Sequence, residues 1–108
     1  MTPKTKKENN VDEAERLFHD DWASKIDVNL IDPTISFESK VALEGRWIFE
    51  KIGNVKGLKL LELGSGAGEG AVYFAMKGAN VTATDLSPGM LKVAVKLAKK
   101  IMYLLKHL

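Results

Sequence analysis

The feature that most constrains the fold of this chain is a glycine-rich segment placed directly after an apolar run. Residues 58–63 are apolar except for one lysine and one glutamate, and glycines follow at alternate positions, Gly64, Gly66 and Gly68. A second run rich in β-branched residues, 80–85, ends in an aspartate. Glycine lets a backbone turn tightly and approach a ligand without a Cβ. The succession predicts a buried strand, a glycine turn, a helix, a second strand and a carboxylate at its tip.

Periodic apolar residues predict two helices before this segment. Spacings of three and four residues indicate one helix from Val11 to about Ile26. Ser36 is the expected N-cap of a second helix, which Gly53 ends. The stretch 29–34 connects the two helices, because the residue before a proline avoids helical backbone.

Further helices are expected between and after the two strands. The stretch 69–77 predicts the first of them. Ser87-Pro88 begins a last helix that runs towards His107, because a hydroxyl can cap the helix and proline fits its first position. The apolar stripe and solvated lysines of this last helix favour a core helix over one that binds a membrane or a partner.

Composition limits the class of protein. At 108 residues, with 45% hydrophobic and 28% charged residues, the chain has the size and balance of one small soluble domain. Its net charge of +2 is too small to indicate nucleic acid binding, and it has no cysteine for a disulfide or a thiolate metal site. Lysines near the N-terminus are followed by no apolar core, so no signal peptide is expected, and no apolar stretch reaches the ~20 residues that span a membrane. A cytoplasmic location without membrane contact is therefore expected.

The carboxylates around the glycines indicate which kind of ligand the turn would hold. Asp85, at a strand tip, can accept hydrogen bonds from both hydroxyls of a ribose. Glu62 and Glu69 would be unfavourable beside a diphosphate but would tolerate a cation. The dinucleotide pattern G-x-G-x-x-G/A fails when counted from Gly64 and is met when counted from Gly66. A fragment of an NAD-binding oxidoreductase therefore stays as an alternative.

Two stretches, 61–68 (LELGSGAG) and 78–91 (GANVTATDLSPGML), closely resemble class I S-adenosylmethionine-dependent methyltransferases. The resemblance implies that the protein binds S-adenosylmethionine and transfers its methyl group to a small-molecule acceptor. In such enzymes methyl transfer is an in-line displacement at a sulfonium, and much of the catalysis is positioning. The resemblance points to no metal and identifies no catalytic residue.

The same resemblance implies roles for individual residues. Glu62 would face the methionyl end of the cofactor, and Asp85 would hold the ribose. Leu86 and Met90 would border the adenine. The loop residues expected to bind the cofactor are Gly64, Ser65, Gly66 and Gly68.

The resemblance also implies a fold. We expect an α/β chain with a partial Rossmann-like methyltransferase fold, in which two parallel strands have flanking helices and an N-terminal helical cover. Residues 1–10 are expected to be a disordered tail, 11–56 the cover, and 57–108 the first βαβα of the cofactor-binding domain. The segment 18–23 is similar to the cover helix of family members that act on small molecules.

Three polar residues in that segment raise the question of a base or an acceptor site: His19, Asp20 and Asp21. No partner residue that would activate a base is visible in the sequence. The favoured interpretation is an exposed helix surface, with Phe18 and Trp22 packing beneath it.

The number of strands leads to a second hypothesis. The family fold has seven strands, and this chain supplies two. An unpaired strand edge can pair with another chain, so a non-catalytic product that self-associates through this edge is the alternative. Residues 101–105 also stay apolar at the position where members of the family usually end this helix and continue with a polar turn and a strand. A truncated or frameshifted product and a genuine short protein with a longer last helix are both consistent with this.

Overall fold

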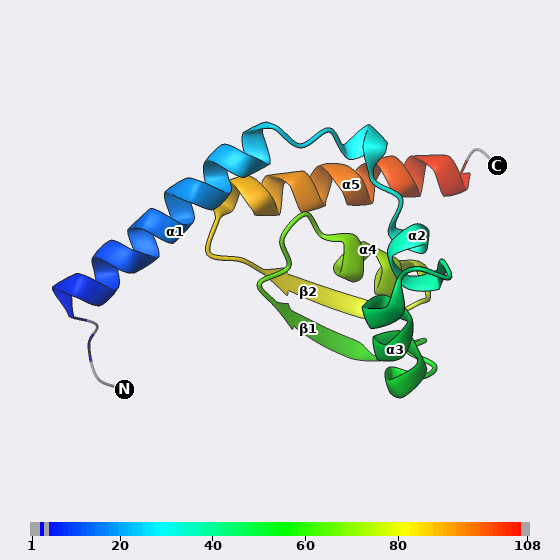
Figure 1. The fold of residues 1–108 in the computed structure, drawn as a ribbon. Coiled ribbons are helices and arrows are strands. Elements are labelled where there is room, and N and C mark those ends of the chain that lie inside the picture. The colour runs from blue at the N-terminus through cyan, green and yellow to red at the C-terminus, as the bar shows by residue number, and fades with distance from the viewer. Residues whose placement is uncertain (1–2, 4, 107–108) are drawn as a thin grey trace.

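The computed structural model describes residues 3 and 5–106 (Figure 1). Helices precede and alternate with two strands. In chain order the elements are α1 (Lys6–Ser24), a short 3-10 helix η1 (Val28–Leu30), α2 (Pro33–Glu38), α3 (Leu43–Ile52), β1 (Lys59–Leu63), α4 (Glu69–Met76), β2 (Asn80–Thr84) and α5 (Pro88–Lys106).

The two strands form a parallel sheet, as predicted. Their register runs from Lys59 opposite Asn80 to Leu63 opposite Thr84. Helix α4 makes the crossover between them, which a parallel pair requires. The last four elements begin and end within about one residue of the predicted positions, and His107 lies outside the described residues. The α/β fold class and the βαβα order are therefore confirmed.

The expectation that the first strand is buried is wrong, since each residue of β1 is exposed or only half-buried. Helices α4 and α5 lie on the same side of the sheet in Figure 1. Leu60 and Glu62 of β1 are half-buried on that side, whereas Leu61 and Leu63 alternate to the other face and are 65% and 77% exposed. Leu61 borders a cavity beside Ile48 and Ile52 of α3, but both leucines remain mostly exposed, so this apolar face of β1 stays open.

Two apolar clusters hold the N-terminal helices to the βαβα unit. The first brings Ala23 of α1 against Met90 and Val93 of α5. The second packs Val55, Phe74 and Ala79 together, with the partly buried Phe37, Phe49, Leu60 and Val81 around them. Residues 11–56 therefore pack against the unit at each cluster.

Helix α1 is longer than predicted. It begins at Lys6, so residues 6–10 are helical where a disordered tail was expected. The reason is a capping box: the Thr5 hydroxyl accepts from the Glu8 amide, and the Glu8 carboxylate accepts from the Thr5 amide at 2.7 Å. Such a box satisfies two amides that a helix start leaves unpaired.

The predicted second helix is two helices. Asp32 caps α2, and Pro33 occupies its first turn, so the chain that was expected to be a connector starts a helix. Ser36 is therefore inside α2 and is no N-cap. A Cβ at Gly45 of α3 would clash with the Ser36 carbonyl oxygen of α2. The two helices therefore pack against each other, which the residues of one continuous helix could not do.

The connector between α1 and α2 is fixed to the far part of α5. The Lys100 ammonium donates hydrogen bonds to the carbonyl oxygens of Val28, at 2.7 Å, and Ile31, at 3.0 Å.

Within the described residues, none of the helices combines the length and apolar character needed to cross a lipid bilayer.

Candidate cofactor site

The glycine loop leaves the end of β1 in a conformation that side chains rarely adopt. Gly64, Gly66 and Gly68 have φ angles of 68°, 55° and 85°. A Cβ at Gly68 would lie 2.5 Å from the Ala94 Cβ, so this glycine lets the loop press against α5. A Cβ at Gly64 or Gly66 would have no heavy atom within 4 Å. The first two glycines therefore leave open space beside the loop, which a ligand could approach.

Asp85 lies against this loop. Its Oδ2 accepts from the Gly66 amide at 2.9 Å, and its Oδ1 accepts from the Ser87 amide at 2.8 Å. The Ser65 amide donates to the Thr84 carbonyl at 2.8 Å, which holds the loop to the end of β2. An ionised carboxylate offers about four lone-pair sites. Two backbone bonds therefore leave Asp85 able to accept two further hydrogen bonds.

Glu62 lies in apolar surroundings on the helix side of β1. It lines a cavity of about 280 Å³ together with Phe37, Gly70 and Phe74. A Cβ at Gly70 would lie 3.2 and 3.3 Å from its two carboxylate oxygens. Within the described part of the chain nothing donates a hydrogen bond to this carboxylate, and burial raises the pKa of Glu62. The glycine-loop residues do not line this cavity, so the structure does not bring Glu62 and Asp85 into one cavity.

The remaining predicted cofactor residues differ in accessibility. The Ser65 hydroxyl is buried and has no hydrogen-bond partner in the part of the chain that the structure describes. Leu86 is half-exposed beside Asp85. Met90 is 3% exposed, because α1 and its own helix enclose it in the first apolar cluster. Only Leu86 of this apolar pair therefore presents its side chain to a ligand in the present arrangement.

The polar residues of α1 have roles that differ from the prediction. Asp20, expected on a helix surface, accepts hydrogen bonds from the Ser87 hydroxyl and from the Gly89 amide at 2.9 Å. Phe18 and Trp22, expected to pack beneath, are 65% and 53% exposed, and their rings flank His19. Asp20 shares a helix face with Ala23, the buried residue of α1, but its two donors are more than 60 positions away, so its role was not readable from the local sequence.

A second set of polar contacts holds α2 over the start of α4. The Ser36 hydroxyl donates to the Glu69 carboxylate, which therefore does not face a ligand freely. The Tyr73 hydroxyl donates to the Glu38 carboxylate at 2.6 Å. Burial, followed by the bond to Glu38, raises the pKa of Tyr73, and the same bond lowers the pKa of Glu38. These contacts were not predicted, since they join residues more than 30 positions apart.

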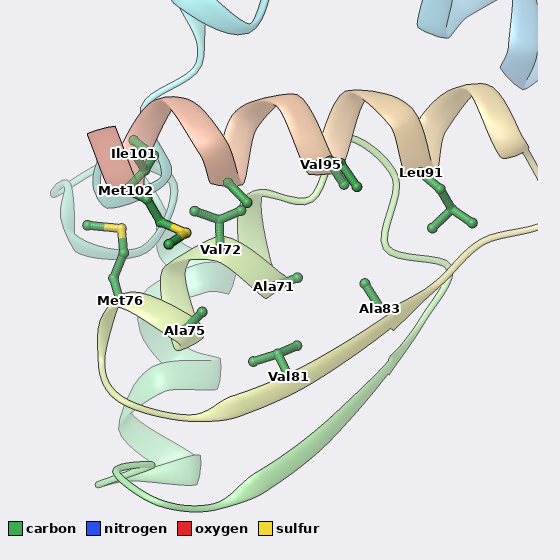
Figure 2. Close-up of a pocket in the computed structure, with 12 residues that line it drawn as sticks. Ala71, Val72, Ala75, Met76, Val81, Ala83, Leu91, Val95, Ile101 and Met102 are labelled. Carbon is green, nitrogen blue, oxygen red and sulfur yellow. The ribbon is translucent and has the colours of Figure 1, made fainter. Parts of the chain in front are cut away.

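A larger cavity lies elsewhere. It has a volume of about 690 Å³, is open to solvent on one side and lies between α4, β2 and α5 (Figure 2). Side chains of α5, among them Leu91 and Val95, point across it towards Val72 of α4 and Val81 of β2. All of its lining residues are apolar, and none of the predicted cofactor residues is among them. The volume of a cavity therefore does not identify the cofactor site. The polar loop beside Asp85 is the better candidate for it.

Comparison with known proteins supports the same region. Residues 61–106 match a family model described as a methyltransferase domain. A search of curated proteins and a search of solved structures each gave no match. The matched residues include the glycine loop, α4, β2, Asp85 and α5.

Proposed function

We propose that this chain contributes the adenosyl-binding part of a class I, S-adenosylmethionine-dependent methyltransferase, since residues 61–106 match a family model described as a methyltransferase domain. The observation that carries the proposal is the Asp85 carboxylate, bonded to the Gly66 amide at 2.9 Å and free to accept two more bonds. Its position at the end of a parallel strand, beside a glycine turn, is where such folds bind nucleosides.

Each part of the site has a task that its chemistry supports. Asp85 accepts hydrogen bonds from the two ribose hydroxyls of the cofactor. Gly64 and Gly66 let the cofactor approach the backbone, since no side chain occupies the space beside them. Leu86, half-exposed next to Asp85, packs against the adenine. The buried Ser65 hydroxyl, which has no partner in the described residues, supplies a donor at the loop.

Glu62 fits the positively charged end of the cofactor. Its half-buried carboxylate has no hydrogen-bond donor among the described residues, and burial raises its pKa, so its ionised form is poorly stabilised. A cationic amino group would stabilise that ionised form. Glu62 and Asp85 open on different spaces in this structure, so binding of the methionyl end requires the space around Phe37 and the loop to join.

When bound, S-adenosylmethionine supplies an electrophilic methyl group on a positively charged sulfur. The residues of this chain bind and orient the cofactor, and they do not include an assigned base. We infer a small-molecule acceptor, because the segment around Phe18 and Trp22 is similar to the cover helix of small-molecule members and lies against the start of α5. The proposal for this chain is cofactor binding, and methyl transfer itself is proposed for a protein that also contains the remaining strands of the family fold.

Isothermal titration calorimetry with S-adenosylhomocysteine tests the cofactor site. We expect the wild-type chain to bind it, and Asp85→Asn to weaken binding by about a hundredfold, since the negative charge and one of the two acceptor oxygens are lost. Asp21→Asn is the matched control, because Asp21 pairs with Lys25 on the surface of α1. NAD, titrated in parallel, should give no heat. Heat with NAD and none with S-adenosylhomocysteine would instead support a dinucleotide oxidoreductase.

A second candidate, self-association, is favoured by the open leucines of β1. No described strand pairs with the outer edge of β1, and Leu61 and Leu63 are 65% and 77% exposed. An antiparallel pair centred on Leu61 would place Lys59 opposite Leu63 of a second copy and Glu62 opposite Leu60. No like charges would then face each other. Light scattering tests this candidate: a stable dimer that ignores S-adenosylhomocysteine supports it, and a monomer at all concentrations rejects it.

A further inference from the structure

Asp20 of α1 and Asp85 of the candidate cofactor site meet at one residue, Ser87. The Ser87 hydroxyl donates to Asp20, while its amide donates to Asp85 at 2.8 Å. Ser87 is completely buried. Its oxygen also accepts from the Met90 amide at 3.1 Å, so the same side chain caps α5. A carboxylate on the N-terminal helix is therefore linked through one serine to the carboxylate proposed to hold the ribose.

The turn between β2 and α5 is shaped to receive Asp20. The Gly89 amide donates to the Asp20 Oδ1 at 2.9 Å. A Cβ at Gly89 would lie 2.9 Å from that oxygen and 3.2 Å from the Ala23 Cβ, so a larger residue would push α1 away. Ala23 is 6% exposed in this contact. Helix α1 is thus seated on the turn by two hydrogen bonds and one close apolar contact.

The charge state of Asp20 suits this role. The hydrogen bonds from Ser87 and Gly89 hold the pKa of Asp20 below its ordinary value. Arg16, one turn earlier, adds an ion pair at 3.2 Å and is itself paired with Glu13. Asp20 therefore stays ionised, and hydrogen bonds to an ionised acceptor are stronger than those between neutral groups.

We propose that Asp20 is a positioning residue: through Ser87 it fixes Asp85 and so links the seating of α1 to the binding of the adenosyl group. The proposal rests on the proposed cofactor function. Removing the Asp20 carboxylate releases the Ser87 hydroxyl and the Gly89 amide, so the turn that holds Asp85 loses its fixed position. Linkage is reciprocal, so a bound adenosyl group must in turn strengthen the seating of α1.

Calorimetry with S-adenosylhomocysteine on three variants of the full chain tests the proposal. We expect Asp20→Ala to weaken binding about tenfold and Asp20→Asn, which keeps an acceptor oxygen, about threefold. Asp21→Ala, the neighbouring surface carboxylate, should change binding less than about twofold. Circular dichroism checks that each variant folds. If Asp20→Ala does not fold, Asp20→Asn carries the comparison.

A double-mutant cycle separates positioning from a general loss of stability. On an Asp85→Asn background, Asp20→Asn should cost less than about twofold further, because its effect passes through Asp85. Independent, multiplicative losses would overturn the proposal, and so would unchanged binding by both Asp20 variants. Hydrogen exchange gives a second readout: S-adenosylhomocysteine should slow exchange of the Gly89 amide in the wild type, and unchanged exchange would contradict the linkage. Absence of binding by the wild type would overturn the cofactor function itself and the linkage with it.

Discussion

The turn after β2 and the open face of β1 differ in how many of their interactions this chain supplies. The polar groups of the turn are hydrogen-bonded, whereas the apolar side chains of the face are exposed. At the turn, Asp85, Ser87 and Asp20 form a connected set of hydrogen bonds around a completely buried serine. At the open face, Leu61 and Leu63 are mostly exposed, and no described strand pairs with the outer edge of β1, the strand that bears them. The polar site is therefore assembled by residues of this chain, whereas the apolar surface of the sheet is not covered by them.

This difference shows that the hydrogen bonds of the site can form without full apolar packing of the sheet. The hydrogen bonds at the turn need only a strand tip, a helix start and one face of α1. Covering a parallel sheet needs helices on both faces, and α4 and α5 lie on one. The cavity of about 690 Å³ lies on the opposite, helix-covered face, between α4, β2 and α5, so packing is incomplete there as well. The site can thus be well ordered beside a sheet that is thinly packed.

The largest expected effect comes from the junction between the loop and α5. Gly68→Ala should lower the free energy of unfolding by about 2–4 kcal/mol, because the new Cβ would lie 2.5 Å from Ala94 on a left-handed backbone. Gly64→Ala shares the positive φ but meets open space, so about 1 kcal/mol is expected. Urea denaturation of both variants measures the difference. Equal losses would show that the contact with α5 is unimportant.

An intermediate effect is expected at Glu62, where stability and binding should change in opposite directions. Burial raises the pKa of Glu62, so its ionised form is unfavourable in the folded chain above that raised pKa. Glu62→Gln should therefore raise the melting temperature by a few degrees at pH 7 and weaken binding of S-adenosylhomocysteine. As the pH falls from above the raised pKa to below the ordinary pKa of a glutamate, wild-type Glu62 becomes protonated in the folded and the unfolded chain, and the difference in melting temperature should shrink and disappear. A constant difference across this range would reject the assignment to Glu62.

The smallest effect on folding is expected at the open face. Leu63→Thr should change the free energy of unfolding by less than about 0.5 kcal/mol, since the side chain is 77% exposed. Leu60→Thr, on the covered side of the same strand, is the control and should cost about 1–3 kcal/mol. If Leu63→Thr costs as much as Leu60→Thr, the leucine face is covered in solution. Concentration-dependent melting would then identify a second copy as the cover.

The parts of the fold that were predicted correctly have local signals. A glycine turn after an apolar run, β-branched residues before Asp85 and a Ser-Pro helix start each define an element within a few residues. The capping box of Thr5 and Glu8 and the Asp32-Pro33 helix start are equally local, so the sequence could have predicted both. The close crossing at Gly45 is different, because it depends on a contact between two helices.

The residues of the candidate site also divide into those with a local sequence signal and those placed by long-range contacts. The placement of Asp85 beside the loop followed from the order of strand, turn and strand. Asp20 could not be assigned from its own surroundings, because its two donors are more than 60 positions away in the chain. The apolar setting of Glu62 likewise depends on Phe37, which α2 brings over β1. Long-range contacts of this kind decide which carboxylates are held and which remain free.

The bonds from Lys100 to Val28 and Ile31 have a practical consequence. Two of its three donor hydrogens are engaged by backbone carbonyls, so this amine should react slowly with acylating reagents while most other lysines of the chain, which are exposed, react quickly. Mass spectrometry of partially acetylated protein would then report, from a single residue, whether the segment joining α1 to α2 is seated on α5.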